Sequence, residues 1–512
     1  MDIDFNPGFN RALDLMENTS QNIFITGRAG TGKSTLLNYF RRQTKKKIAV
    51  LAPTGVAAIN VQGQTIHSFF KFKPNITLQS IKKIREDDKK NIYKKLDAIV
   101  VDEISMVRAD VLDCVDKFLR LNGKTSKKPF GGLQMIFIGD LYQLPPVATS
   151  QEKEIFLSHY KSPYFFSAQL FENFEMEFIE LEKIYRQQEE GFISLLNSIR
   201  NKATTDEDIA LLNQRVSPEY TTEEYCIYLT PKNVDAEVIN AEKLNQLKGK
   251  MYIFEANIKG TFGKESYPTR PTLSLKTGSQ VMMVNNDYRN RWVNGTMGKV
   301  LGIEKYDDAM SVVVKLEDGQ EVEVSPYTWE IYKFFLETDA IQSETIGSFT
   351  QYPLVLAWAL TIHKSQGKPF NKVVFNIGSG VFMLGQVYVA LSRCTTFEGL
   401  ILKKPIQKKH IWLDYDVVKF ITNFQYQESE SKLPLHKKVE LIEESIKQNQ
   451  SLEFVYLKAT NEKFTRNITP TFVGTMSYQD KEYLGVKGLC HQSQQERVSR
   501  VDRILDMKRT AM

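Results

Sequence analysis

Cysteine is scarce in this 512-residue sequence. The chain has four, without a C-x-x-C pair or any other metal-ligand spacing. Such sparse usage excludes a disulfide scaffold and predicts reduced core thiols. Long hydrophobic runs are also lacking, because the longest nearly apolar stretch, 352–362, is too short to span a bilayer. The first residues show no basic segment followed by an apolar core, so we expect no signal peptide, a cytoplasmic location and no membrane partner.

Neither sign of charge dominates. The chain has 67 Lys and Arg against 61 Asp and Glu, a net charge of +6, which permits a nucleic-acid partner without arguing for one. Apolar content of 42% and charged content of 25% are typical of globular proteins. The length predicts about three to four domains.

Residues 27–34 read GRAGTGKS, the G-x-x-x-x-G-K-[ST] phosphate loop. The loop follows a short β-branched run and precedes a helical pattern, so backbone N–H groups and the helix dipole point at a polyphosphate. In this motif Lys33 reaches the β- and γ-phosphates and Ser34 holds Mg²⁺. The sequence therefore predicts an ATP and Mg²⁺ site at Gly27, Gly30, Thr31, Gly32, Lys33, Ser34 and Thr35.

Continuous apolar runs recur through the first part of the chain, at 22–26, 47–53, 96–103 and 134–140. Such runs predict an α/β fold with a parallel sheet that is covered on both faces, with ligands at the carboxyl ends of the strands. Residues 68–95 are polar, basic and aromatic, and we interpret them as a small insertion.

A second series of runs follows at 177–187, 226–233, 279–285, 372–378 and 398–403, and predicts a second α/β domain. Between about 245 and 350 the pattern turns to β, with a hairpin signal at Asp318-Gly319. We expect an all-β insertion there. Residues 426–437 are polar and charged and are predicted to be a linker to a small C-terminal unit.

Acidic and basic side chains complete the predicted ATPase site. Asp102 and Glu103 end the third apolar run, where Asp102 would bind Mg²⁺ and Glu103 would activate the attacking water. Gln143 in GDLYQLPP can contact that water and the γ-phosphate. Arg186 and Arg393 are candidates for arginine fingers, which stabilise charge on the γ-phosphoryl group, although a surface ion pair is the alternative for each.

Nine motifs occur in order along residues 5–425. They are GRAGTGKS, LAPTGVAA (51–58), GQTIHSFF (63–70), VVDEISM (100–106), GDLYQLPP (139–146), LEKIYRQ (181–187), LTPKNVDAEVIN (229–240), WALTIHKSQG (358–367) and YVALSRC (388–394). This series resembles superfamily 1 helicases, and most closely the Pif1 family of the superfamily 1B branch, which is related to RecD-type helicases.

The resemblance implies two RecA-like domains with ATP between them and single-stranded DNA across both. It assigns 1–165 to the first domain, with 68–95 as a strand-separating wedge, and 170–425 to the second, with 245–350 as a small β-barrel. Lys33, Glu103 and Gln143 then become catalytic residues of the first domain. Arg186 and Arg393 become γ-phosphate contacts from the second, and Gly367 lines the nucleotide cleft.

The same resemblance assigns DNA contacts to short polar groups at strand ends, which suit sequence-independent binding of phosphate and sugar. Phe72, with Phe69 and Phe70, can stack on bases or form part of the wedge, although three Phe in five residues also suit a buried junction. The predicted DNA-binding residues are Pro53, Thr54, Gly55, Thr65, His67, Phe72, Thr230, Lys232, Asn233, His363 and Lys364.

One position departs from the family. A glutamine usually precedes the first strand and reads the adenine ring, and here Phe9 stands at that place, followed by Asn10. We expect both at the nucleotide base, with Phe9 stacking on the ring and nucleotide discrimination correspondingly loose.

The C-terminal unit, 438–512, reads as a helix followed by strands and resembles a WYL domain with an incomplete central triplet, Glu482-Tyr483-Leu484. Its arginines suggest a basic patch for phosphate or single-stranded nucleic acid, with solvated arginines as the alternative. They are Arg466, Arg497, Arg500 and Arg503.

We interpret the chain as a monomeric ATP-dependent DNA helicase. The resemblance implies movement in the 5′→3′ direction on single-stranded DNA and action on forked or G-rich structured DNA in genome maintenance. Two alternatives stay open at this point: a RecD-like motor subunit of a nuclease complex, and an ATP-switched regulator that binds nucleic acid.

Overall fold

The computed structural model describes residues 4–73, 76–84, 91–146, 159–220, 224–306, 309–337, 340–377, 383–478 and 481–510. The chain divides into two compact units. One comprises Met1–Asn197 with Asp206–Trp412, and the other Ser198–Thr205 with Leu413–Met512. Among the described helices none combines the length and apolar character that crossing a bilayer requires.

The first sheet has six parallel strands in the order β3-β2-β4-β5-β1-β6. Its central strands alternate between two buried faces. Ile23 and Ile25 pack with α1 and α2, whereas Phe24 contacts Phe165 on the other face. The elements are α1 (Pro7–Asn18), β1 (Ile23–Gly27), α2 (Lys33–Gln43), β2 (Ile48–Ala52), α3 (Gly55–Asn60), β3 (Gln64–Thr65), α4 (Ile66–Phe70), β4 (Ala98–Val101), α5 (Ala109–Asn122), β5 (Gln134–Ile138) and β6 (Glu177–Leu181).

A second parallel sheet has four strands in the order β18-β7-β19-β20. The two parallel sheets confirm the predicted α/β core. The elements are α7 (Glu190–Arg200), α8 (Asp206–Asn213), β7 (Cys226–Thr230), α9 (Asn233–Gln246), β18 (Ala359–Thr361), β19 (Lys372–Phe375), α10 (Gln386–Leu391) and β20 (Leu400–Leu402).

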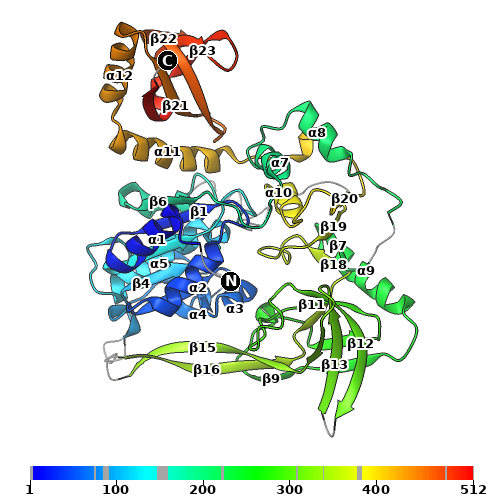
Figure 1. Cartoon of the computed structure of the whole chain (residues 1–512). Helices are drawn as coiled ribbons and strands as arrows, with labels where there is room; N and C mark the ends of the chain where they lie inside the picture. Colours follow the sequence, from blue (N-terminus) through cyan, green and yellow to red (C-terminus); the bar gives the residue numbers. More distant parts are fainter. Residues whose placement is uncertain are drawn as a thin grey trace. The chain divides into compact units, whose positions relative to one another are not determined.

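Antiparallel strands fill the interval between α9 and β18, where the sequence predicts an all-β insertion (Figure 1). Five form the sheet β14-β13-β12-β11-β17, and Gly319, at a φ of 91°, turns the chain between β13 and β14 as expected. The strands are β8 (Tyr252–Glu255), β9 (Asn257–Gly260), β10 (Thr272–Leu275), β11 (Gln280–Met283), β12 (Met297–Tyr306), β13 (Ala309–Leu316), β14 (Glu321–Val324), β15 (Tyr327–Glu337), β16 (Ala340–Gln351) and β17 (Leu354–Leu356).

The second unit contains two helices and an antiparallel sheet in the order β24-β23-β22-β21-β25. Its own apolar core includes Ile442, Phe454 and Val486. The elements are α11 (Tyr415–Lys432), α12 (Leu435–Lys447), β21 (Ser451–Leu457), β22 (Lys463–Tyr478), β23 (Lys481–Cys490), β24 (Gln495–Arg500) and β25 (Ile504–Thr510).

Three sequence-based assignments differ from the structure. The run at 177–187 supplies β6, which pairs with β1 in the first sheet rather than the second. The run at 279–285 supplies β11, which lies in the antiparallel sheet. Residues 426–437, expected as a linker, complete α11 and begin α12. Ser429 is buried there, and its hydroxyl accepts a hydrogen bond from the Lys438 ammonium (2.8 Å).

Candidate nucleotide and DNA sites

The phosphate loop connects β1 to α2. Gly30 and Gly32 have φ values of 83° and 87°, a left-handed conformation that favours glycine. Gly32 is the N-cap of α2 and offers no side chain to the first-turn N–H groups, which leaves them for an anion. A Cβ at Gly30 would lie 2.5 Å from the Cβ of Arg186, so this glycine is also required by close packing.

Lys33 and the two following residues stand at the start of α2. The Lys33 ammonium donates hydrogen bonds to the carbonyls of Gly27 (2.7 Å) and Arg28 (2.9 Å). Ser34 and Thr35 are exposed on the first turn of the helix. The Lys33 ammonium is therefore held against the loop whose backbone N–H groups would bind the phosphates of a nucleotide.

Asp102 and Glu103 follow β4 directly. Burial raises the pKa of Asp102 to about 6 and that of Glu103 to about 7. The Asp102 carboxylate raises the pKa of Glu103 further, whereas the Lys33 ammonium lowers the pKa of both groups. Glu103 has a φ of 50°, which is unusual for a residue with a side chain. Strain of this kind gathers at functional sites, and a carboxylate with a raised pKa suits a general base.

Asp140 was not singled out in the sequence, although it stands in the GD-x-x-Q turn. Its carboxylate accepts hydrogen bonds from the Gln143 side chain (3.1 Å) and from the Tyr142 N–H (3.2 Å). The buried Asp140 thus fixes the orientation of the Gln143 amide. A Cβ at Gly385 would lie 2.5 Å from the carbonyls of both Tyr142 and Gln143, so the start of α10 packs directly on this turn.

Arg393 is completely buried beyond the end of α10. Its guanidinium donates to the Val389 carbonyl (2.9 Å) and to the Ser392 hydroxyl (2.9 Å). Burial and the nearby Arg186 lower the pKa of Arg393 to about 9, against the attraction of Glu103. The structure therefore brings Arg393 towards the acidic end of β4.

Arg186 donates to the carbonyls of Gly367 (2.8 Å) and Ser392 (3.3 Å). It follows β6, so it comes from the first sheet and not, as the resemblance implied, from the second. Tyr388, which the sequence analysis missed, accepts a hydrogen bond from the Ala29 N–H of the phosphate loop (3.1 Å). The predicted nucleotide residues of both halves, including Gly367, thus meet at one place.

Phe9 and Asn10, which we expected at the nucleotide base, have other contacts in the structure. Phe9 is 3% exposed and packs in the core with Ala12 and Met16, so its assignment to the adenine ring is wrong. These residues are three and four apart and form the buried face of α1, which Asn6 caps by accepting from the Phe9 N–H (3.0 Å). Asn10 is exposed and donates to the Phe5 carbonyl (2.9 Å).

Several predicted DNA residues lie at the carboxyl ends of β2 and β3. Pro53 directly precedes Thr54, whose hydroxyl caps α3. The Thr65 hydroxyl caps α4. A cavity of about 410 Å³ is lined by Gly55, Thr65 and His67 together with residues of β15 and β16. Burial lowers the pKa of His67, which is therefore neutral at pH 7 and can contact a strand only as a hydrogen-bonding group.

The other predicted DNA residues follow β7 and β18, which are parallel neighbours. Lys232 and Asn233 begin α9, and His363 and Lys364 follow β18. Burial lowers the pKa of His363 as well. Thr230 is 2% exposed and its hydroxyl donates to the Lys232 carbonyl (3.0 Å), so it is not placed to reach a strand.

Phe72 is not free to stack on a base. Its ring is stacked on Phe70 (centroids 5.3 Å apart) and meets the edge of Phe118 (5.7 Å), and only a small part of it lines the 410 Å³ cavity. Phe69 joins the same buried group through Tyr93. This packing contradicts stacking of Phe72 on a base and fits the buried-junction alternative, whereas contact of its cavity-lining edge with DNA stays a prediction. Part of the expected wedge, 74–75 and 85–90, lies outside the described residues.

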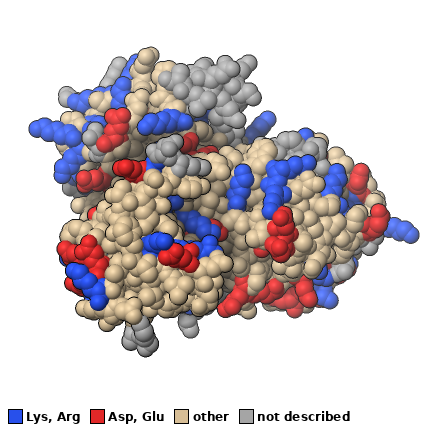
Figure 2. Space-filling model, turned by 90° about the horizontal axis from the view of Figure 1, so that it is seen from above, with Lys and Arg blue, Asp and Glu red and all other residues tan. Residues whose placement is uncertain are grey.

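On the face shown in Figure 2, basic and acidic side chains are interspersed, so charge does not mark a path for DNA on that face. The fold and site instead define a class. A phosphate loop, a buried Asp-Glu pair and two arginines at the junction of two parallel sheets are the parts of a P-loop NTPase motor.

Comparisons with known proteins identify the family. The model of the PIF1-like helicase family matches residues 9–209. The ATP-dependent DNA helicase Pif1 of Bdellovibrio bacteriovorus is 32% identical over 413 residues, which cover 78% of this chain and 88% of that protein. The chain belongs to the Pif1-like helicase family. Other relatives are longer, and the chain spans 58% of human PIF1.

Solved structures of a Bacteroides Pif1 are similar. The complex with ADP-AlF4 is 36% identical, with a TM-score of 0.76 over 83% of this chain and 98% of that one. The complex with single-stranded DNA is 37% identical, with a TM-score of 0.59 over 82% of this chain and 96% of that one. At similar identity and coverage, the TM-score is thus higher for the complex with ADP-AlF4 than for the complex with single-stranded DNA.

Proposed function

We propose that this chain moves 5′→3′ along single-stranded DNA and unwinds duplex or structured DNA ahead of it. As a Pif1-like protein it is an ATP-dependent DNA helicase. Five further properties are proposed: the direction of movement, the forked or G-rich DNA substrate, action as a monomer, a role in genome maintenance and a cytoplasmic location. The observation that carries nucleotide-driven movement is the contact between the phosphate loop and α10, in which the Ala29 N–H donates to the Tyr388 hydroxyl. The direction follows from the family resemblance.

That contact couples nucleotide binding to movement. Arg186 joins the loop side of the site to the carbonyls of Gly367 and Ser392, which belong to the second sheet's segments. Phosphates at Lys33 would compete for the N–H groups and cations that now hold these carbonyls and the Tyr388 hydroxyl. Binding and release of nucleotide therefore change the attachment of one sheet to the other, and DNA contacts on both sheets move relative to each other.

The residues present fit Mg²⁺ with ATP. Ser34 and Asp102 would hold the ion, since a hydroxyl and a carboxylate are the oxygen ligands that Mg²⁺ takes beside phosphates and water. No group of three or more His, Cys, Asp or Glu side chains suited to a metal occurs among the described residues. Bound Mg²⁺ would neutralise charge developing on the phosphates.

The remaining side chains have separate tasks. Glu103 takes a proton from the attacking water, and Gln143, fixed by Asp140, orients that water. Lys33 leaves the loop carbonyls to contact phosphate oxygens. Arg186 and Arg393 place positive charge where the γ-phosphoryl group gains negative charge.

We further propose that the all-β insertion is the family's small barrel, and that the second unit is a WYL-like domain that contacts single-stranded DNA. Arg497 and Arg503 support the latter, because both carry charge on or near β24 and β25. Arg466 and Arg500 already contact other side chains of the same unit. Arg466 donates to the Ser499 hydroxyl (2.7 Å), and Arg500 forms an ion pair with Asp502 (2.6 Å).

Unwinding assays test the main proposal. Duplexes with a 5′ tail, a 3′ tail or a 5′ tail ahead of a folded G-rich block are compared with ATP and Mg²⁺. We expect the 5′-tailed substrates to be separated and the 3′-tailed one to stay intact. Equal separation of the 3′-tailed duplex would overturn the direction, and DNA-independent ATP turnover without separation of any substrate would overturn the function.

A further inference from the structure

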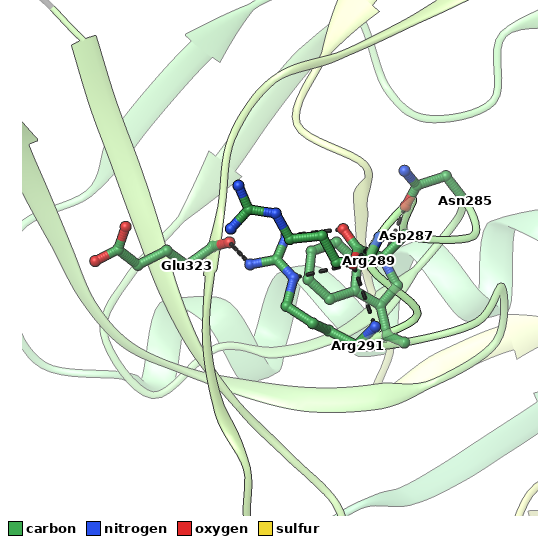
Figure 3. Close-up of polar contacts among 6 residues, drawn as sticks. Asn285, Asp287, Arg289, Arg291 and Glu323 are labelled. Atoms are coloured by element: carbon green, nitrogen blue, oxygen red, sulfur yellow. Dashed lines mark hydrogen bonds and ion pairs between the residues drawn. The ribbon is translucent and has the colours of Figure 1, made fainter.

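The loop between β11 and β12, residues 285–296, folds around one buried carboxylate. Asp287 accepts hydrogen bonds from the backbone N–H groups of Arg289 (2.9 Å) and Arg291 (3.2 Å). The Arg291 guanidinium forms two further bonds to the same carboxylate, at 3.0 and 2.7 Å, as Figure 3 shows. These contacts lower the pKa of Asp287 to about 2, with the Arg291 side chain as the largest cause.

A tryptophan completes the loop's scaffold. Trp292 is 6% exposed, its indole N–H donates to the Asn285 side chain (3.0 Å), and the Arg291 guanidinium lies 4.5 Å from its ring centroid. Arg291 also donates to the Glu323 carbonyl of β14 (3.2 Å), which ties the loop to the sheet (Figure 3). The loop is therefore held in one shape before any ligand binds.

The side chains of Tyr288 and Arg289, which belong to this loop, are exposed to solvent. Tyr288 is 79% exposed, and Arg289 is exposed beside it with its guanidinium 5.1 Å from the tyrosine ring centroid. Within the described part of the chain the Arg289 side chain makes no hydrogen bond or ion pair. Both residues line a cavity of about 760 Å³ together with the exposed Arg42 of α2. A large exposed aromatic ring that shares a cavity with arginine side chains is typical of a nucleic-acid contact.

The loop lies between segments that the motifs assign to DNA. The Asn294 side chain donates to the Asn60 side chain at the end of α3 (3.0 Å), the helix that begins at Gly55. On its other side a Cβ at Gly295 would lie 3.4 Å from the side chain of Lys368, which follows the HKSQG motif. The loop therefore lies next to a segment of each sheet region that carries predicted DNA residues.

Lys368 adds a second reason to expect an anion here. It is partly buried, its ammonium donates to the Met282 sulfur (4.0 Å) and is repelled by the nearby Lys364 ammonium, and it has no carboxylate partner among the described residues. A cation in this setting is stabilised when a phosphate approaches.

We propose that loop 285–296, together with Arg42, binds single-stranded DNA as a site additional to the motif residues. Arg289 and Arg42 contact phosphates, and Tyr288 stacks on an unpaired base. The exposed ring selects a single strand over a duplex, because paired bases offer no free face for stacking. This inference rests on the proposed function of the chain as a DNA helicase.

Binding measurements on the full chain test the site. Arg289→Ala and Tyr288→Ala are compared with Tyr288→Phe, which keeps the aromatic ring, and with Arg270→Ala. Arg270 is a matched control, since it is an exposed arginine of the same all-β region that pairs with Glu237. Fluorescence anisotropy gives the affinity for an oligo-dT strand and for a blunt duplex at several salt concentrations. ATP turnover without DNA is measured alongside.

We expect Tyr288→Ala to weaken oligo-dT binding about 5- to 100-fold and Tyr288→Phe to leave it unchanged. Arg289→Ala should flatten the log–log salt dependence by about 0.7, and adding Arg42→Ala should remove about as much again. DNA-independent turnover should stay at the wild-type rate in all variants.

The wild-type chain is expected to bind oligo-dT tightly. If the variants at Tyr288 and Arg289 then bind it as well as Arg270→Ala does, this inference is overturned and the proposed function stands. Weaker binding of the blunt duplex alone would overturn the single-strand assignment. A wild-type chain that binds no oligo-dT would overturn the proposed function itself.

Discussion

Gly30→Ala isolates the packing between the phosphate loop and Arg186. The new methyl group would lie 2.5 Å from the Arg186 Cβ, whereas ordinary contacts begin near 3.4 Å, so the two segments must separate by about 1 Å. A shift of that size in a catalytic group costs on the order of 10² in rate, and full loss of an arginine finger on the order of 10³. We therefore expect DNA-stimulated ATP turnover to fall by about 10²- to 10³-fold, with little change in single-strand affinity.

Gly319→Ala is the matched control for this variant. Gly319 has a φ of 91°, close to the 83° of Gly30, but a Cβ there meets nothing within 4 Å. Both substitutions thus carry a similar backbone strain of about 1–2 kcal/mol in the free energy of unfolding. Steady-state ATPase assays and thermal unfolding of the two variants separate strain from displacement. Turnover of Gly30→Ala within threefold of Gly319→Ala would refute the reasoning.

Three further predictions concern the site and the second unit. Lys33→Ala should abolish ATP binding, whereas Glu103→Gln should bind nucleotide but not hydrolyse it; near wild-type turnover of Glu103→Gln with DNA would remove Glu103 as the base. Arg186→Ala and Arg393→Ala should each lower turnover on the order of 10³-fold and spare DNA affinity; parallel losses of affinity and turnover in a titration would mark them as strand contacts instead. Deleting 413–512 should leave a DNA-stimulated ATPase with a flatter salt dependence of single-strand binding, and superimposable salt titrations would show that the second unit does not touch DNA.

The boundary of that deletion follows from the structure. A cut at residue 438, which the sequence pattern suggested, would leave α11 without α12 and expose Ser429, whose hydroxyl bonds the carbonyls of Ile504 (3.0 Å) and Leu505 (2.7 Å). The polar residues of 426–437 read as a linker because a helix that packs by one narrow face has few apolar residues. Composition alone does not separate such a helix from a loop.

Four strands of the first sheet, β1, β2, β4 and β5, could be predicted because each is a continuous apolar run buried on both faces. The strand with which each of them pairs could not be predicted. Residues 177–181 have the composition of any buried strand, and only pairing with Ile23–Gly27, more than 150 positions away, places them in the first sheet. That pairing decides that Arg186 extends from the phosphate-loop side of the site.

Phe9 shows the same limit within a helix. Alignment with a family motif suggested a base contact, but the ring lies on the same face as Ala12 and Met16, and burial against the sheet stabilises it more than exposure would. The spacing of three and four residues was present in the sequence and could have indicated the core.

The sequence by itself determined the chemistry of this protein, because the phosphate loop, the Asp-Glu pair and the arginines are local patterns whose side chains define the reaction. Tertiary structure alone decided which of them meet. The Ala29–Tyr388 contact joins residues 359 positions apart, and the shape of loop 285–296 depends on the single carboxylate of Asp287. Contacts of this kind arise from the packing of separate sheets and loops, and local sequence patterns do not encode them.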